Sequence, residues 1–557
     1  MYDPTLQGAE RINCLYLPTD TPQSERQICE ELLIELQNEL IEHNIYVRDF
    51  IQICQIPEED LQNAAFVISE RERPNNAGSR TYTSHNLHEV SVLMPDQVGN
   101  RDIIVRKRGG GIQQIKDTNR AVDSLSFVLL HPKGTDGWSP DQIMYSEGDV
   151  MNNVDYEGKR LACNNFYKYR LMEREGQTNH FLLSGRLLQE YVCISFAKAE
   201  QQRLNFVEMN QSKLRSDLYQ NVADHMLQAD VDGKELGRQI ILPATHTGSP
   251  RNMHAKFQDG MAVCRRYGKI DLFLTITTNP NWHEIRENLS PGQKPEDRPD
   301  LIARVFKLKL DNFEEELLKD GIFGSRIANM RVIEWQKRGL PHAHILIILC
   351  DRDKIKTVQQ VDQIVVAEIP PHPDTIFHQD PDKQKEKREQ VKRLRELVLT
   401  HMVHGPCGKE KSSSPCMYNH NGELTDVCHK HFPKDFTSDT IWDNNTSYAN
   451  YRRRTSDNGG SEALHNDRII DNSWIVPYSP YLLLRYNCHL NVEIYVSSKA
   501  TKYLYKYVNK GGDRAMLKVD ENGNNGTRNE VKEYQDLRSI GASEASWRLF
   551  KFEMSDR

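Results

Sequence analysis

The sequence predicts an α+β fold in which one antiparallel sheet is covered by helices. Residues 331–349, RVIEWQKRGLPHAHILIIL, hold two strand-like runs separated by a turn that contains Gly and Pro. Residues 272–278 are β-branched and aromatic, which is typical of a central strand. Residues 299–321 show helical spacing, with Pro299 at the start and Gly321 at the end. Strand, helix and hairpin in this order favour a sheet with helices on one face. We expect the helix to point four residues inward: Leu301, Val305, Leu308 and Phe313.

The rest of the chain adds further predicted elements. Apolar periodicity predicts helices at residues 24–43, 186–228, 254–267 and 378–399. The stretch 86–130 reads as strand-rich and includes the runs DIIVRKR, GIQQI and SLSFVLLHP. Residues 445–472 are rich in Asn, Asp, Gly and Arg and are predicted to form a loop, in which Arg452–Arg454 can meet a DNA backbone.

Length and composition limit the class of protein. At 557 residues the chain exceeds one ordinary domain, so we expect about two to four. The formal charge of −7 argues against a uniformly basic DNA-coating surface, so nucleic-acid contacts must come from local patches. Eleven cysteines without regular disulfide spacing favour a reducing compartment. No apolar run approaches the roughly 18 residues of a membrane span. We therefore expect a soluble, intracellular protein with no membrane partner.

The predicted hairpin carries half of a metal site. His342 and His344 lie one residue apart, so both imidazoles project from the same face of a strand. Glu334 and Gln336 share a face of the preceding strand and can lie across from the histidines. Two imidazoles and one oxygen ligand leave open positions for a phosphate and water. The alternative is a pair of core histidines satisfied by hydrogen bonds.

A second stretch, residues 497–514 (SSKATKYLYKYVNKGGDR), is predicted to be a basic helix. Tyr503 and Tyr507 lie at positions i and i+4 and share a face, whereas Tyr505 points elsewhere. Pre-placed phenols among cations suit attack on a phosphate. The interleaved lysines are candidate DNA contacts: Lys502, Lys506 and Lys510. The alternative is an ordinary amphipathic helix with aromatic packing.

A Gly/Pro/Ser-rich segment at 404–431 carries a third set of ligand types. One imidazole and three thiols match the ligands of a closed structural zinc site: His404, Cys407, Cys416 and Cys428. Three further histidines compete for the fourth position: His420, His429 and His431. The spacings are looser than in paired Cys-x-x-Cys motifs, so reduced, unligated thiols are the alternative.

Together these stretches resemble the Rep nuclease region of Helitron rolling-circle transposases, a branch of the HUH endonucleases. The resemblance covers about residues 190–514 and includes family phrases such as LTITTNPNW, VIEWQKRGLPHAHILIIL, HGPCG and KYLYKYVNKGGDR in family order. It places His342 and His344 at the HUH positions and matches Tyr503 and Tyr507 to the family's tyrosine pair. It also implies that the sheet is HUH nuclease-like.

The resemblance implies a domain order. Residues 1–185 are expected to form a mixed α/β region, 186–250 a helical, DNA-contacting domain, and 251–515 the nuclease, with the Cys/His loop inserted at 404–431. Residues 516–557 are expected to be a linker and tail leading towards a helicase. No G-x-x-x-x-G-K-[ST] phosphate loop occurs in the sequence, so we expect a helicase partner from elsewhere.

The implied activity is a single-strand DNA endonuclease and strand transferase dependent on Mg or Mn, acting in the nucleus. A tyrosine attacks the DNA and retains a 5′-phosphotyrosine. Two rival hypotheses remain at this point. One is a catalytically silent, DNA-binding transposon remnant. The other is a zinc hydrolase of a different substrate, which would need a nearby general base and no role for the tyrosines.

Overall fold

The computed structural model describes residues 23–48, 103–106, 112–115, 118–142, 159–211, 240–319, 321–335, 339–418, 424–442, 448–496 and 540–556. The chain divides into two compact units, Met1–Gln202 and Arg203–Arg557. The domain boundaries expected from the sequence stay predictions. Among the helices of the described ranges, none combines the length and apolar character needed to cross a membrane.

The described part of the first unit is mainly helical. Its elements are α2 (Gln23–His43), β1 (Ile103–Arg106), β2 (Ile112–Ile115), α5 (Ala121–Ser126), η1 (Val128–Leu130), α7 (Cys163–Arg170), η2 (His180–Leu183) and α8 (Arg186–Met209), which ends in the second unit. Strands β1 and β2 pair antiparallel. The helices expected at 24–43 and from 186 onward are confirmed where the structure describes them.

The run SLSFVLLHP is not a strand, which corrects the prediction. It forms the end of α5 and the 3-10 turn η1. Its apolar residues are buried by tertiary packing, because Phe127 packs edge-on against Tyr191 of α8 and Leu130 is buried. Nearby, Asp123 accepts hydrogen bonds from Tyr167 at 2.9 and 3.1 Å. A short apolar run in a sequence can be either a strand or a buried helix. Here the run is helical and its apolar side chains are buried without pairing to a strand.

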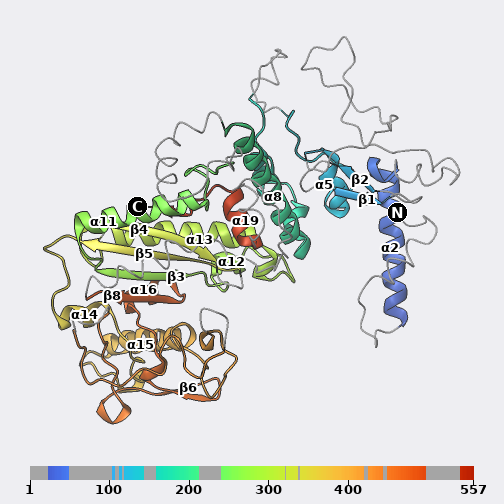
Figure 1. The fold of residues 1–557 in the computed structure, drawn as a ribbon. Coiled ribbons are helices and arrows are strands. Elements are labelled where there is room, and N and C mark those ends of the chain that lie inside the picture. The colour runs from blue at the N-terminus through green and yellow to red at the C-terminus, as the bar shows by residue number, and fades with distance from the viewer. Residues whose placement is uncertain are drawn as a thin grey trace. The chain divides into compact units, whose positions relative to one another are not determined.

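The second unit is built on a five-stranded antiparallel sheet of order β8-β3-β5-β4-β9. The strands are β3 (Leu272–Thr277), β4 (Arg326–Trp335), β5 (Pro341–Leu349), β8 (Leu490–Ile494) and β9 (Ser555–Asp556). Figure 1 shows β3, β5 and β4 lying beneath α13 (Pro299–Glu314). The predicted α+β class is confirmed, as are the central strand at 272–277 and the hairpin of β4 and β5.

One face of this sheet carries the main core. Alternate residues of the strands, including Ile333, Ala343 and Ile345, pack against α13. Helices α16 (Pro480–Tyr486) and α19 (Ala542–Leu549) contribute to the same cluster. Helix α13 continues as a π-helical turn at Glu315–Lys319. Leu301, Val305 and Phe313 are buried as expected, but Leu308 is 66% exposed, which corrects its predicted inward direction.

The opposite face has an apolar half and a polar half. Phe273, Leu346 and Ile348 form the apolar half, which packs against α11 (Pro250–Tyr267). Ser249 caps α11 by accepting from the backbone N–H of Asn252. The polar half lies farther along the same strands and includes both histidines of β5. Helices therefore cover both faces, whereas the sequence predicted them on one.

Residues 350–496 add smaller elements before β8. They are α14 (Val358–Ile364), α15 (Pro381–His401), β6 (Ala463–His465), β7 (Arg468–Ile470) and several 3-10 turns. The helix expected at 378–399 is confirmed as α15. The hairpin of β6 and β7 corrects the predicted loop at 445–472. Its turn residues, Asn466 and Asp467, both have positive φ, which two-residue hairpin turns favour.

The arginines at 452–454 make contacts within the fold, and the burial of Arg453 corrects its expected role as a DNA contact. Arg453 is buried and donates to the backbone carbonyls of Asn472 and Ile475 at 2.6 and 2.7 Å. Arg454 makes a two-pronged ion pair with Glu368, at 2.9 and 2.7 Å. Arg452 lies 3.4 Å from the same carboxylate.

The C-terminal residues belong to the sheet layer, although the sequence placed them in a tail. Trp547 of α19 is fully buried in the main core, and its ring lies 6.0 Å from that of Phe306. Strand β9 then pairs with β4 through Arg331 and Val332. Burial of a large aromatic side chain supplies enough apolar area to hold such a short helix in place.

Candidate functional site

The pairing of β4 with β5 brings three metal-ligand types together. In the antiparallel register Glu334 lies directly opposite His342, and Val332 lies opposite His344. Residues opposite one another across two strands project from the same face, as do residues two apart along one strand. The carboxylate and both imidazoles therefore share the polar half of the sheet. We call Glu334, His342 and His344 the sheet cluster.

The distances within the sheet cluster suit a shared cation better than direct hydrogen bonds. Oε2 of Glu334 lies 3.5 Å from Nε2 of His342 and 3.6 Å from Nε2 of His344. A charged imidazole–carboxylate hydrogen bond is shorter, at about 2.7–2.9 Å. Two ligands that each lie about 2.1 Å from one ion are about 3.0–3.5 Å apart. All three side chains are buried, so charge on the carboxylate must be compensated inside the site.

Strand β3 orients His344. Its Thr275 lies opposite His344 in the register, and Oγ1 of Thr275 is 3.0 Å from Nδ1 of the imidazole. When Nδ1–H donates to that hydroxyl, the lone pair lies on Nε2, which is the tautomer a cation requires. Phe273 stacks on the same ring at 5.5 Å with an interplanar angle of 11°. These contacts fix the ring before any ligand binds.

Polar residues on β3 and β8, which no local sequence pattern singles out, face the same side of the sheet. Thr277 lies opposite His342, and Asn491 of β8 lies opposite Thr275. Three buried polar atoms on this face, Oγ1 of Thr277, Oδ1 of Asn491 and Nδ1 of His342, have no hydrogen-bond partner among the described residues. Buried polar atoms without partners are costly, and their concentration here indicates a place for a polar ligand.

Glu493 extends this polar face along β8. It lies opposite Phe273 and two residues from Asn491, so both side chains point the same way. Burial raises the pKa of Glu493 to about 7, although Arg453 and Lys434 oppose that shift. Perturbed carboxyls gather at functional sites. The position of Glu493 beside the site depends on the pairing of β3 with β8, which lie more than 200 residues apart in the chain. The alternation of apolar and polar residues in LNVEI is only a weak local signal.

Several predicted site residues lie outside the described residues. They are the alternative ligand Gln336, the tyrosines Tyr503 and Tyr507, and the lysines Lys502, Lys506 and Lys510. Their roles stay predictions from the sequence.

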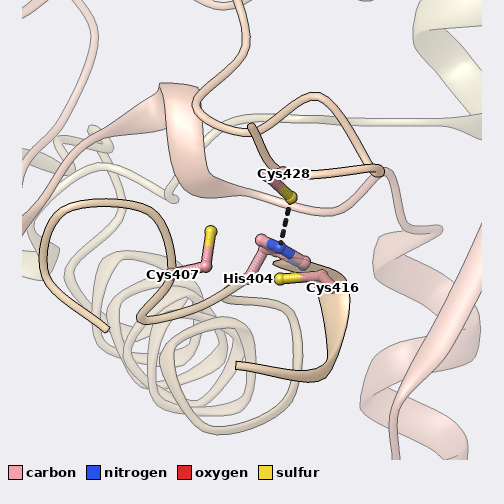
Figure 2. Close-up of side chains that lie close together, drawn as sticks. All are labelled: His404, Cys407, Cys416 and Cys428. Atoms are coloured by element: carbon pink, nitrogen blue, oxygen red, sulfur yellow. Dashed lines mark hydrogen bonds between the residues drawn. The ribbon is translucent and has the colours of Figure 1, made fainter. Parts of the chain in front are cut away.

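A second group of ligand types lies in the loops that follow α15. His404, Cys407, Cys416 and Cys428, which we call the loop cluster, offer one ligand atom each, and these four atoms lie within 4.8 Å of one another (Figure 2). Burial, followed by the charges of Lys430 and Lys434, lowers the pKa of His404 to about 4. Of the competing histidines, His429 and His431 are exposed and His420 lies outside the described residues.

One comparison with known proteins identifies a region of the chain. Residues 166–347 match the family described as the Helitron helicase-like domain at the N-terminus. The match includes β3, β4 and most of β5, and with them the whole sheet cluster; it ends before the loop cluster and the tyrosine pair. A search of curated proteins gives no significant match.

Proposed function

We propose that this chain, whose residues 166–347 match the Helitron helicase-like domain family, is a metal-dependent endonuclease and strand transferase for single-stranded DNA. The observation that carries the proposal is the convergence of Glu334, His342 and His344 on one sheet face within the matched region. The family links the chain to Helitron transposition and hence to DNA. The geometry adds a ligand set that can hold a cation beside a phosphate.

The sheet cluster fits a divalent ion such as Mg or Mn. A carboxylate and two imidazoles suit such ions, and three ligands leave open positions for substrate oxygens. A cation bound there would draw charge from the non-bridging oxygens of the scissile phosphate. Thr275 keeps Nε2 of His344 directed to the site. We assign the third ligand to Glu334 in preference to Gln336, because an anionic oxygen holds a hard cation better than a neutral amide.

The attacking group in this proposal is Tyr503 or Tyr507. The phenolic oxygen forms a bond to the scissile phosphorus and gives up its proton, while the bond from phosphorus to the 3′ oxygen breaks. That oxygen takes up a proton and leaves as a free 3′-hydroxyl, and the downstream strand stays on the enzyme as a 5′-phosphotyrosine. Because the phosphotyrosine is a phosphodiester, a 3′-hydroxyl can later reverse the step without ATP.

Two phenols at i and i+4 explain strand transfer. In the helix that the sequence predicts for residues 497–514, their Cβ atoms would lie about 5–6 Å apart on one face, so both could reach one phosphate in turn. While one phenol holds a 5′ end, the second remains available to cut another strand. The spacing supports this division of labour, because in the predicted helix Tyr505 would be turned about 200° from Tyr503 at 3.6 residues per turn.

The test is adduct formation on a pool of random-sequence, 3′-end-labelled single-stranded oligonucleotides with Mn²⁺. Wild type should give a labelled protein–DNA adduct. At least one of Tyr503→Phe and Tyr507→Phe should still nick, both should impair strand transfer, and the double variant should form no adduct. Tyr505→Phe is the matched control and should be nearly neutral.

Two results would contradict the proposal. An adduct that survives in the double variant would show that another residue is the nucleophile. Binding of the oligonucleotides by wild type without any adduct would favour the silent DNA-binding remnant instead.

A further inference from the structure

The loop cluster is built from three separate turns. His404 follows the C-terminal end of α15, Cys407 lies three residues later, and Cys416 lies in the 3-10 turn η7 (Pro415–Met417). Cys428 comes from a later loop, and Sγ of Cys428 is 3.4 Å from Nε2 of His404. Figure 2 shows the sulfur atoms of the three cysteines around the His404 ring. Residues distant in the sequence thus meet at one point.

These distances match a tetrahedral zinc centre. Zinc holds sulfur at about 2.3 Å and imidazole nitrogen at about 2.0–2.1 Å, so ligand atoms lie about 3.6–3.8 Å apart. The observed Sγ–Nε2 separation and the 4.8 Å limit for all four atoms are close to this arrangement. A disulfide would use two of the three thiols and leave the third beside a buried imidazole. One zinc ion uses all four ligands.

The surrounding contacts hold the ligands in place. The His404 ring stacks on Phe432, with centroids 4.2 Å apart and an interplanar angle of 16°. Backbone N–H groups of Lys430 and Phe432 hydrogen-bond to Cys428. The backbone N–H of His429 donates to the carbonyl of Cys416 at 2.8 Å. Such support of ligands by neighbouring groups is typical of metal sites.

The segment around the cluster has little else to stabilise it. Its buried apolar core consists of Cys407, Met417 and Cys428, with only Cys416, Phe432 and Trp474 packed against it. In the described part of residues 404–433, η7 is the one helical turn, and no named strand occurs. Segments with so small a core usually depend on a metal or a disulfide for their fold.

We propose that the loop cluster binds one structural Zn²⁺, which fixes residues 404–433 against the chain that leads into β8. Two backbone hydrogen bonds join these parts: His404 donates to Trp474 at 2.8 Å, and Lys434 donates to Ser473 at 2.9 Å. Farther along, Val492 of β8 donates to Pro477 at 3.1 Å. The ion therefore supports the strand that carries Asn491. This inference is independent of the nuclease proposal.

The experiment is metal analysis of the purified full chain by mass spectrometry. We expect about one zinc per chain in wild type, and a loss of most of it in Cys407→Ser and in Cys416→Ser. Cys350→Ser is the matched control, because Cys350 is a partly buried free cysteine outside the cluster, and it should keep its zinc.

A second measurement uses wild type alone, so that its result does not depend on whether the variants fold. Cobalt exchanged into the wild-type chain should show thiolate-to-cobalt charge transfer and the visible bands of a tetrahedral site. Removal of the metal with a mercurial and a chelator should open residues 404–433 to limited proteolysis, and zinc should restore protection. Wild type without zinc, iron in its place, or full zinc retention in Cys407→Ser would each overturn the assignment.

Discussion

The sheet cluster combines histidines with a carboxylate, and the loop cluster combines a histidine with three thiols. Different forces hold the two clusters in place. Glu334, His342 and His344 are fixed by the backbone ladder between β4 and β5, which lies inside a five-stranded sheet. The loop cluster lies on turns with a very small apolar core. We therefore expect the first arrangement to persist when the ion is removed and the second, as proposed above, to depend on one. This is the usual difference between a catalytic and a structural metal site.

The composition of the two clusters points the same way. The sheet cluster offers three ligands, with polar atoms of Thr277 and Asn491 on the same face, so a cation there keeps positions open for substrate. The loop cluster offers four ligands, which close a tetrahedron. Loss of a ligand should therefore abolish chemistry at the first site and stability at the second.

The largest expected effect is on nicking by His342→Ala. Loss of several kcal/mol of charge stabilisation in the transition state lowers the rate by about 10³-fold or more. Single-strand binding should be largely retained, because the cation serves chemistry more than affinity. Rates of adduct formation and oligonucleotide binding by fluorescence anisotropy measure the two effects separately.

The matched control is His283→Ala, because the His283 side chain is 72% exposed on α12 (His283–Arg286) and is not one of the ligands of the cluster. It should behave as wild type. Equal losses of binding and cleavage in His342→Ala would remove the distinction between the two clusters. Loss of activity in Gln336→Ala but not in Glu334→Ala would show that the assigned oxygen ligand is wrong.

A smaller effect is expected for Thr275→Val, which keeps the shape of the side chain and removes the hydrogen bond to Nδ1 of His344. Loss of a group that orients a metal ligand typically costs about 10–100-fold in affinity or activity. The apparent Mn²⁺ affinity in the nicking assay should weaken by that factor, with part of the rate recovered at high Mn²⁺. Thr278→Val, three residues later, removes a hydroxyl that donates to the carbonyl of Pro341 instead, and it serves as the comparison. Equal metal dependence of the two variants would argue against an orienting role for Thr275.

Local patterns in the sequence predicted the framework of the sheet cluster. The turn between two apolar runs predicted the hairpin, and the histidine spacing placed both rings on one face, as the register shows. The sequence also predicted α13 from its end signals and periodicity, and α11 apart from its first turn. By contrast, Thr275, Thr277, Asn491 and Glu493 join the site only through pairing of β3 with β5 and β8. Pairing between such distant segments depends on tertiary packing, which a local pattern does not contain.

The corrected elements have the same cause. Leu308 fits the helical stripe of α13 but faces outward, because the buried face of the helix is centred on Ile302, Phe306 and Phe313. Arg453 looked like a surface cation, yet carbonyls from two other segments surround it. The hairpin of β6 and β7 had a readable signal in Asn466 and Asp467, which adopt the positive φ that such turns need.

The smallest expected effect concerns Glu493, which tests how far the polar face of the sheet extends. Burial raises its folded pKa to about 7 from an ordinary value of 4.5, so the folded chain binds more protons than the unfolded chain between these two values. Stability should therefore fall as pH rises from about 4.5 to about 7 and change little from this group above that range.

Glu493→Gln removes the ionisation while keeping the size of the side chain, and it should flatten this part of the stability profile. The gain at pH 8 should be on the order of 1–3 kcal/mol, because the pKa of about 7 already includes the opposing charges of Arg453 and Lys434. Urea unfolding of both chains at pH 5 and pH 8 measures the difference, and Glu462→Gln, at an exposed glutamate, is the control. If the free energy difference between wild type and Glu493→Gln is the same at both pH values, the carboxyl is ordinarily ionised and the polar face ends at Asn491.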